Sequence, residues 1–296
     1  AQTFMDMHRA GLVEGLFLSS GIIRGGQATQ DKLLDTVSIL REKHHFTGYI
    51  HLKVMPGAER EQVRQAMTLV DRLSTNLEAP NPARLKDLAP LKRFDEELLQ
   101  PLQWVEEIRR SEPAYLGWNG RWPSTTTQFV VGALPESDLE LLATSDYLFQ
   151  HLRLGRTYYS AFHPVPDTPL ENHPAEDPLR QHRLYQASFL FRDYGFDLED
   201  MPFDQAGNLP RAIDPKLAWA EQHLAGAPVE LNRAQKSELL RVPGLGPIGA
   251  ERIIQARRLG TLGDVTHLRQ LGLRTRPMEP YILLDGRRPV YQLKLF

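Results

Sequence analysis

The sequence contains no cysteine, and this absence removes several kinds of chemistry from the chain. Without thiols the chain forms no disulfide, supplies no thiolate to a zinc ion and carries no cysteine nucleophile. No stretch approaches the roughly 18 apolar residues that a membrane-spanning helix needs. The N-terminus lacks the basic-then-apolar pattern of a secretory signal. We therefore expect a cytoplasmic protein without a membrane partner.

A further absence concerns nucleotide cofactors. No G-x-G-x-x-G motif follows a predicted strand, which disfavours a dinucleotide-binding fold. The chain also opens without methionine, directly on a helix-like pattern, and this predicts that its N-terminus is truncated.

Charge is distributed unevenly along the chain, although the formal net charge is only −2. From Leu231 onward there are 12 Lys and Arg against 5 Asp and Glu, whereas the first 230 residues carry 23 against 32. A change of sign of this size indicates two regions with different partners. The alternative is an ordinary fluctuation of charge along one body.

The first two-thirds of the chain alternates short apolar segments with amphipathic ones. Strands are predicted in GLFLSS, FTGYIHLKV, RLSTNLEAP, TTTQFVVGA and GRTYYSAFHPV, with helices between them and a mostly helical insert at residues 83–112. Such alternation is typical of parallel strands joined by right-handed crossovers. Five strands do not close a barrel. Both a partial barrel lacking its first strand and an open Rossmann-like sheet fit the pattern.

Polar side chains share one face of two predicted strands. His51 and Lys53 lie on one face of their strand, and Ser74, Asn76 and Glu78 on one face of the next. Parallel strands buried on both faces are nearly continuously apolar, so this pattern predicts a ligand held near the carboxyl ends of the strands. A satisfied polar network, or a face at an open sheet edge, is the alternative.

Residues 163–182 form a proline-rich connector that contains His163, His173 and His182. Spacings of this kind in a proline-rich loop do not resemble a metal-ligand set, so we predict no metal site there. Two amphipathic helices follow. The first ends at Gly195, and the second starts with Asp214 as its N-cap and Pro215 at its first position.

Residues 241–258, RVPGLGPIGAERIIQARR, predict a tight turn between two helices. Asn232 is the predicted N-cap of the first helix, and Pro247 opens the second. Gly244 and Gly246 allow a tight turn and leave amide N–H groups free to bind an anion such as a phosphate oxygen. The arginines around the turn would add salt-dependent attraction to nucleic acid. The residues predicted to bind nucleic acid are Arg241, Gly244, Gly246, Arg252 and Arg257, with Arg258 beside them. A purely structural helical hairpin is the alternative.

The spacing Val242-Pro243-Gly244-Leu245-Gly246 resembles the helix-hairpin-helix motif of DNA repair proteins and polymerases. A second, weaker unit is predicted around Leu271-Gly272-Leu273. Together with EGLFLSSGI, GYIHLKVMPGA, DRLSTNLEAP, VVGALPESD, YYSAFHPV and HRLYQASFLFRDYGF, the hairpin makes the chain resemble the radical S-adenosylmethionine proteins assigned to DNA modification or repair. The resemblance implies a partial TIM-type (β/α) barrel at 1–165, a connector with helices at 166–230 and a helix-hairpin-helix module at 231–296.

The resemblance also implies a cofactor site. Ser19-Ser20-Gly21 would contact the methionine moiety of S-adenosylmethionine, although this family commonly has Gly-Gly-Glu there. The strand around residues 74–78 would contact ribose and carboxylate, and the segment 132–137 would lie against adenine. The predicted cofactor-binding residues are Ser19, Ser20, Gly21, His51, Lys53, Ser74, Asn76, Glu78, Gly132 and Glu136.

One part of the family pattern is missing. Radical S-adenosylmethionine chemistry uses three cysteines, usually CxxxCxxC, to hold a 4Fe–4S cluster, and this chain has none. We expect these ligands upstream of Ala1, in a truncated segment; a homologue that has lost the cluster is the alternative.

Three functions follow from these patterns. The first is a radical S-adenosylmethionine enzyme acting on nucleic acid, with DNA favoured, that needs a reductant for its cluster and is inactive as this chain alone. The second is a non-catalytic nucleic-acid-binding accessory protein. The third is a small-molecule radical enzyme that uses the hairpin for assembly. No catalytic residue is assigned; Tyr158, Tyr159 and Ser160 lie near the last strand without a predicted role.

Overall fold

The computed structural model describes residues 1–23 and 25–290, and in it the chain forms two compact units. The sheet unit consists of Ala1–Glu136 and Ala143–Asp177. The hairpin unit consists of Ser137–Leu142 and Pro178–Phe296, of which residues 291–296 lie outside the described part. The three-part division predicted at residues 165 and 230 stays a prediction, and its last segment includes those six residues.

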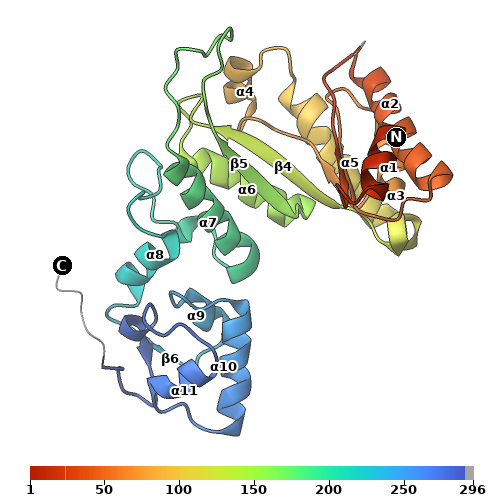
Figure 1. The fold of residues 1–296 in the computed structure, drawn as a ribbon. Helices are drawn as coiled ribbons and strands as arrows, with labels where there is room; N and C mark the ends of the chain where they lie inside the picture. Colours follow the sequence, from red (N-terminus) through yellow and green to blue (C-terminus); the bar gives the residue numbers. More distant parts are fainter. Residues whose placement is uncertain (24, 291–296) are drawn as a thin grey trace. The chain divides into compact units, whose positions relative to one another are not determined.

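A five-stranded parallel sheet organises the sheet unit (Figure 1). Its strands are β1 (Leu16–Leu18), β2 (Ile50–Lys53), β3 (Arg72–Ser74), β4 (Ser124–Val131) and β5 (Arg156–Ala161). They lie side by side in chain order, β1-β2-β3-β4-β5. All five predicted strands are confirmed. In the described residues the sheet is open, with β1 and β5 at its two edges, so a closed barrel is not formed.

Helices between the strands cover one face of the sheet. They are α2 (Gly26–Ser38), α3 (Arg60–Leu69), α4 (Pro82–Leu88), α5 (Gln100–Ser111) and α6 (Asp138–Leu152), while α1 (Gln2–Arg9) precedes β1. When parallel strands follow one another in order, right-handed crossovers place their helices on the same side. Val37, Val63 and Ile108 from three of these helices are fully buried with Leu52 and Leu73 of the strands in one core. The helical insert at 83–112 is confirmed as α4, a π-helical turn (Phe94–Leu99) and α5.

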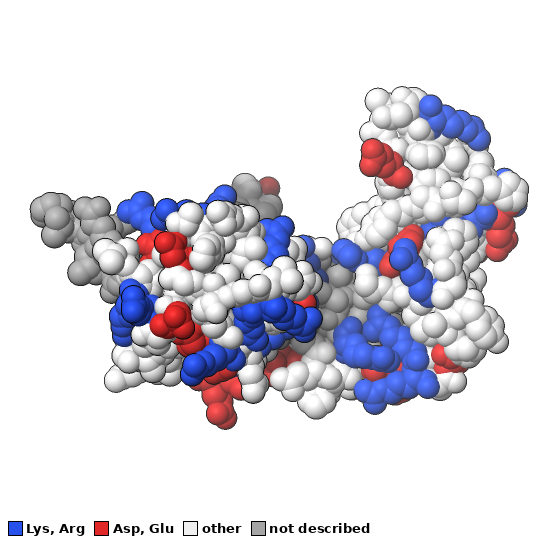
Figure 2. Space-filling model, turned by 90° about the horizontal axis from the view of Figure 1, so that it is seen from below, with Lys and Arg blue, Asp and Glu red and all other residues white. Residues whose placement is uncertain are grey.

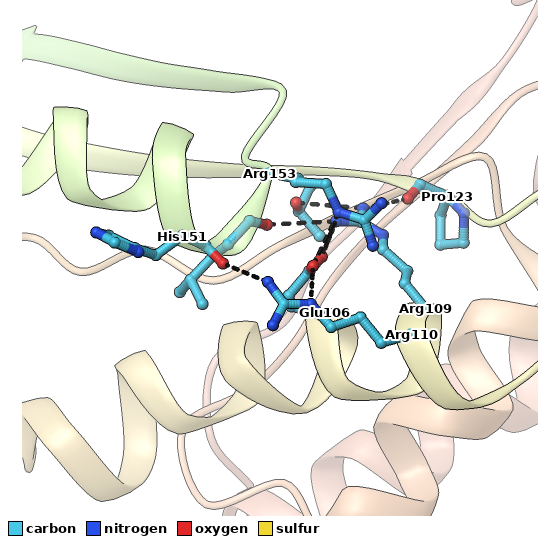
Figure 3. A network of polar contacts seen from close by, with 8 residues as sticks. Glu106, Arg109, Arg110, Pro123, His151 and Arg153 are labelled. Carbon is cyan, nitrogen blue, oxygen red and sulfur yellow. Dashed lines mark hydrogen bonds and ion pairs between the residues drawn. The ribbon is translucent and has the colours of Figure 1, made fainter.

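A buried carboxylate joins α5 to the turn after α6 (Figure 3). Glu106, whose side chain is 4% exposed, accepts hydrogen bonds from Arg110 at 2.7 Å and Arg153 at 2.8 Å. Arg109 lies 3.8 Å from the same carboxylate and donates to the carbonyl oxygen of Pro123 just before β4. Burial alone would raise the pKa of Glu106, but the hydrogen bonds from Arg153 and Arg110 outweigh it and lower the pKa. The network therefore ties three segments distant in sequence into one frame.

The hairpin unit has a separate core. Its elements are α7 (Pro178–Tyr194), α8 (Pro215–His223), β6 (Val229–Glu230), α9 (Lys236–Arg241), α10 (Pro247–Leu259), α11 (Val265–Gln270) and β7 (Ile282–Leu283), and β6 pairs with β7 in parallel. Leu231, Leu239, Val242, Ile253 and Met278 are each fully buried within this core.

Helix ends in this unit follow the predicted caps with one exception. The Asp214 side chain accepts hydrogen bonds from the amides at the start of α8, with Pro215 at the first position, and α7 ends before Gly195 at φ +68°, as predicted. The prediction of Asn232 as the N-cap of the helix before the hairpin is wrong. Asn232 bonds to Glu230 and to the Leu262 backbone instead, and the helix begins only at Lys236, after a capping box between Gln235 and Glu238.

Within the described residues, no helix is both long and apolar enough to cross a membrane.

Candidate nucleic-acid interface and strand-end cavity

The turn between α9 and α10 is the predicted hairpin, residues 242–246. Val242 and Leu245 point into the core and are 0% and 1% exposed, whereas Gly244 faces solvent. Gly244 has φ +77°, and a β-carbon there would lie 3.1 Å from the Pro277 β-carbon. Only glycine adopts this backbone without strain, so the apolar residues anchor the turn and the glycine shapes it.

Amide groups on the turn are left without partners. Gly246 is the N-cap of the 13-residue helix α10, and no side chain caps this helix. The Leu245 amide donates to the Val242 carbonyl at 3.1 Å, but in the described part of the chain the amides of Gly244 and Gly246 make no hydrogen bond. Pro247 has no N–H, and Ile248 in the first turn is 72% exposed. An uncapped helix N-terminus with free amides is an anion site by its partial charge and its donors.

Two of the arginines predicted to contact nucleic acid make contacts within the hairpin unit. Arg241 forms an ion pair with Asp200 at 2.6 Å, and its guanidinium lies 3.9 Å from the centre of the Phe196 ring. Arg257 donates to the backbone carbonyls of Leu231 and Ala234 at 2.9 and 2.7 Å. Both side chains therefore hold the unit together, and their role in binding nucleic acid stays a prediction.

Other basic side chains near the hairpin are open to solvent. Arg252 is exposed and uses one donor on the Leu271 carbonyl at 3.0 Å, and Lys236, Arg258 and Arg276 are exposed as well. Figure 2 shows groups of Lys and Arg on the surface, with Asp and Glu between them. Exposed cations of this kind would add a general electrostatic attraction to a phosphate backbone.

A buried lysine contacts the backbone of the hairpin, and the sequence did not predict this contact. Lys216 of α8 is 7% exposed and donates to the Leu245 carbonyl at 2.6 Å, and its ammonium lies 4.6 Å from the centre of the Tyr194 ring. Burial lowers the pKa of Lys216 to about 7, with Asp214 opposing and Arg241 adding to this effect. No sequence signal pointed to it, because its partner is 29 residues away.

The second, weaker hairpin is not formed. Gly272 does make a tight turn after α11, with φ +74°. In the described residues, however, only a 3-10 turn at Glu279–Tyr281 follows before β7.

The carboxyl ends of β1, β2 and β3 enclose a cavity of about 160 Å³ in the sheet unit. It brings together half of the residues predicted to bind the cofactor, namely Ser20, Gly21, Lys53, Asn76 and Glu78. The predicted location of a site at the strand ends therefore matches a real cavity. Ser19, His51, Ser74, Gly132 and Glu136 are not among its lining residues.

The charged groups of this strand-end cavity lie close together. Glu78, in the left-handed backbone region at φ +64°, forms an ion pair with Lys92 at 3.3 Å. Burial lowers the pKa of Lys53, while Glu78 raises it and Lys92 lowers it. Lys92, from the insert, was missed by sequence reasoning, which assigned the insert no site. One carboxylate facing two ammonium groups makes the cavity suited to a polar, charged ligand.

His51 and Ser74 sit on the polar face of the sheet. The His51 ring packs against Phe17 at 4.6 Å, and its buried Nε2 has no hydrogen-bond partner in the described part of the chain. Burial, assisted by nearby Arg72, lowers the pKa of His51 to about 4, so the ring is neutral at pH 7. Ser74 is 5% exposed and lies opposite Thr126 of β4.

The segment predicted to lie against adenine is occupied by the chain's own side chains. The Gly132 amide donates to Glu136 at 2.7 Å, and its carbonyl oxygen lies 2.9 Å from Nε2 of His173. Gly132 has φ +83°, and a β-carbon there would come within 2.4 Å of Glu176. Its backbone polar groups are therefore already bonded. Contact between this segment and adenine stays a prediction.

Comparison with known proteins agrees with the hairpin geometry. Residues 225–274, which contain α9, the turn, α10 and α11, match the helix-hairpin-helix motif family. A search of curated proteins finds no significant match to the chain. The match covers well under half of the chain, so it identifies a nucleic-acid-binding module rather than a family for the whole protein.

Proposed function

We propose that this protein binds nucleic acid, with DNA as the favoured partner, by holding a backbone phosphate at the 242–246 hairpin. Support comes from the family match over this segment and from the unpaired amides of Gly244 and Gly246 at the uncapped start of α10. Contacts of this kind are made to phosphate and carry no sequence information. The proposed interaction is therefore sequence-independent and falls with increasing salt concentration.

The variant Ile248→Glu tests this proposal without disturbing the core. Ile248 is 72% exposed in the first turn of α10, where a negative charge stabilises a helix by about 0.3–1 kcal/mol through the helix dipole. The same charge repels a phosphate bound at the turn. We expect duplex affinity, measured by fluorescence anisotropy, to fall about tenfold or more while thermal stability is unchanged or higher.

Leu259→Glu is the matched control. Leu259 is 93% exposed at the last position of α10 and receives the same charge at the other end of the helix, roughly 16 Å away along its axis. Its affinity should stay close to that of the unmodified protein. Equal losses in both variants would indicate general charge repulsion and refute a phosphate site at the turn.

The strand-end cavity favours a second candidate function, that of an S-adenosylmethionine-dependent enzyme acting on the bound nucleic acid. The sequential parallel strands are consistent with part of a (β/α) barrel, and Glu78 and Lys53 fit the ammonium and carboxylate of an amino-acid moiety. A cavity of about 160 Å³ takes only that end of the molecule. When bound, S-adenosylmethionine would be the radical source that the resemblance implies only with an electron from a reduced iron–sulfur cluster.

The iron–sulfur cluster does not fit the residues of this chain. A 4Fe–4S cluster is held by thiolates, and the chain has no cysteine. A cluster would need ligands outside this sequence, and it would also need a reductant. No catalytic step is assigned to the residues of this chain.

Calorimetric titration with S-adenosylmethionine separates this enzyme from a non-catalytic binding protein. We expect binding that Glu78→Gln weakens, because the variant removes the only carboxylate among the residues that line the cavity. Asp87→Asn, at an exposed site on α4, is the control for the same change of charge. Absence of binding to the folded protein would leave only the accessory role in nucleic-acid binding.

A further inference from the structure

The hairpin forms one wall of a large cavity within the hairpin unit. This cavity has a volume of about 990 Å³, at the upper end of the roughly 300–1,000 Å³ usual for small-molecule sites. Pro243, Gly244, Leu245 and Gly246 line it together with residues of α7, α8 and the turn before β7. The free amides proposed to hold a phosphate therefore border a space far larger than a phosphate needs.

The lining of this hairpin cavity combines aromatic rings with buried hydrogen-bonding groups. Phe189 and Tyr194 from α7 and Tyr281 from the last 3-10 turn line it, with Arg192 4.8 Å from the centre of the Phe189 ring and Lys216 4.6 Å from that of Tyr194. Lys216 lies in the wall, and its bond to Leu245 leaves further N–H groups of its side chain unused. Asp214 and Gln186 also line the cavity; Asp214 already accepts from the amides at the start of α8, and Gln186 accepts from Arg183. Rings for stacking beside polar groups are the chemistry that recognises a nucleobase.

We propose that this cavity receives an unpaired nucleobase whose own phosphate is held at the hairpin, so that the protein prefers an unpaired nucleotide to an intact duplex. The inference rests on the proposed binding of phosphate at the turn. A nucleotide joins a phosphate to a base within a few ångströms, and here free amides and a ring-lined cavity share the residues Gly244 and Gly246. A base inside a duplex is stacked and paired, and entering the cavity would require unstacking it.

A pair of DNA probes tests the inference. The first is a short blunt duplex, and the second is the same duplex with one unpaired 2-aminopurine in its centre. Stacking of one base on an aromatic side chain predicts that the second probe binds about tenfold more tightly. Stacking in the cavity should also change the fluorescence of the unpaired 2-aminopurine on binding.

Two substitutions of Phe189 separate stacking from packing. Phe189→Leu keeps an apolar side chain but removes the ring, and Phe189→Tyr keeps the ring. We expect Phe189→Leu to lose most of the preference for the unpaired probe while its affinity for the blunt duplex is unchanged. Phe189→Tyr should keep the preference.

The outcomes distinguish the inference from the function on which it rests. Equal affinities for the two probes, in a protein whose duplex binding is sensitive to Ile248→Glu, would overturn the base cavity and leave the phosphate site intact. A preference that survives in Phe189→Leu and Phe189→Tyr alike would also overturn it, since the ring would then play no part. Absence of binding to either probe would refute the proposed function itself.

Discussion

The hairpin and the strand-end cavity are two candidate sites built in different ways. The hairpin presents the backbone amides of Gly244 and Gly246, which have no partner in the described part of the chain. The strand-end cavity presents side chains from three strand ends and an insert, and its central carboxylate, Glu78, is already paired with Lys92. The hairpin can accept an anion without rearrangement, whereas a ligand at the strand ends must compete with an existing ion pair.

This difference extends to what holds each site in place. The hairpin is shaped by the local conformation of Gly244 and by two adjacent apolar anchors, Val242 and Leu245. The strand-end cavity depends on the order of the sheet, which brings the ends of three strands and the insert together. A site made by a local motif survives changes elsewhere, and a site assembled from distant segments does not.

The largest expected effect comes from breaking the frame of the sheet unit. Glu106→Gln removes the charge that compensates Arg109, Arg110 and Arg153 and leaves the buried Arg109 unpaired, which costs about 3 kcal/mol of unfolding free energy. Hydrogen-exchange mass spectrometry should show lost protection in the sheet unit and unchanged protection around the hairpin. Arg110→Gln, at a side chain that is 66% exposed, should change neither.

The next effect concerns an arginine that sequence reasoning assigned to the ligand. Arg241→Ala removes an ion pair with Asp200 and the contact with the Phe196 ring, and we expect a loss of about 2 kcal/mol in the stability of the hairpin unit. At a temperature where the variant is folded, the salt dependence of DNA binding should be unchanged, because this guanidinium is used internally. A shallower salt dependence would show that Arg241 leaves its partners to contact phosphate.

A third effect links the hairpin to pH through Lys216. Its pKa in the folded protein is about 7, below the ordinary value of 10.5, so between these values unfolding takes up a proton. Stability should therefore rise with pH across this window by up to about 1.4 kcal/mol per pH unit, and the cost of burying the charge is fully present below pH 7. Lys216→Met should lack this rise when unfolding by denaturant is followed from pH 6 to pH 10. If the free energy of unfolding rises equally with pH in both proteins, Lys216 does not lose its proton in the folded state across this window.

The sequence predicted what depends on neighbouring residues. The five strands, the caps at Asp214 and Pro215, and the turn at Gly244 all follow from local patterns. The prediction of Asn232 as a cap was wrong because a competing capping box three residues later bonds the same helix, and local preference alone does not choose between two suitable caps. Grouping polar residues by strand face also identified Lys53, Asn76 and Glu78 of the strand-end cavity, whereas His51 and Ser74 from the same grouping do not line it.

Partners distant in sequence could not be predicted. Nothing in the composition or spacing joins Lys216 to Leu245, Arg241 to Asp200, or Gly132 to His173. An arginine beside a glycine turn looks the same in sequence whether it faces solvent or an aromatic ring. The backbone of the hairpin was thus predicted better than its side chains, because backbone geometry is local and side-chain pairing is tertiary.

The smallest expected effect distinguishes exposed arginines of the hairpin from internal ones. Arg252 is exposed and makes one backbone contact, so Arg252→Gln should leave stability nearly unchanged. If its charge lies near a phosphate, the slope of log affinity against log salt concentration should become shallower by about one unit. Arg257→Gln should instead lower stability, since Arg257 holds the carbonyls of Leu231 and Ala234. A steep slope retained in Arg252→Gln would show that Arg252 contacts no phosphate and would leave binding at the hairpin to its amides and to the other exposed basic side chains.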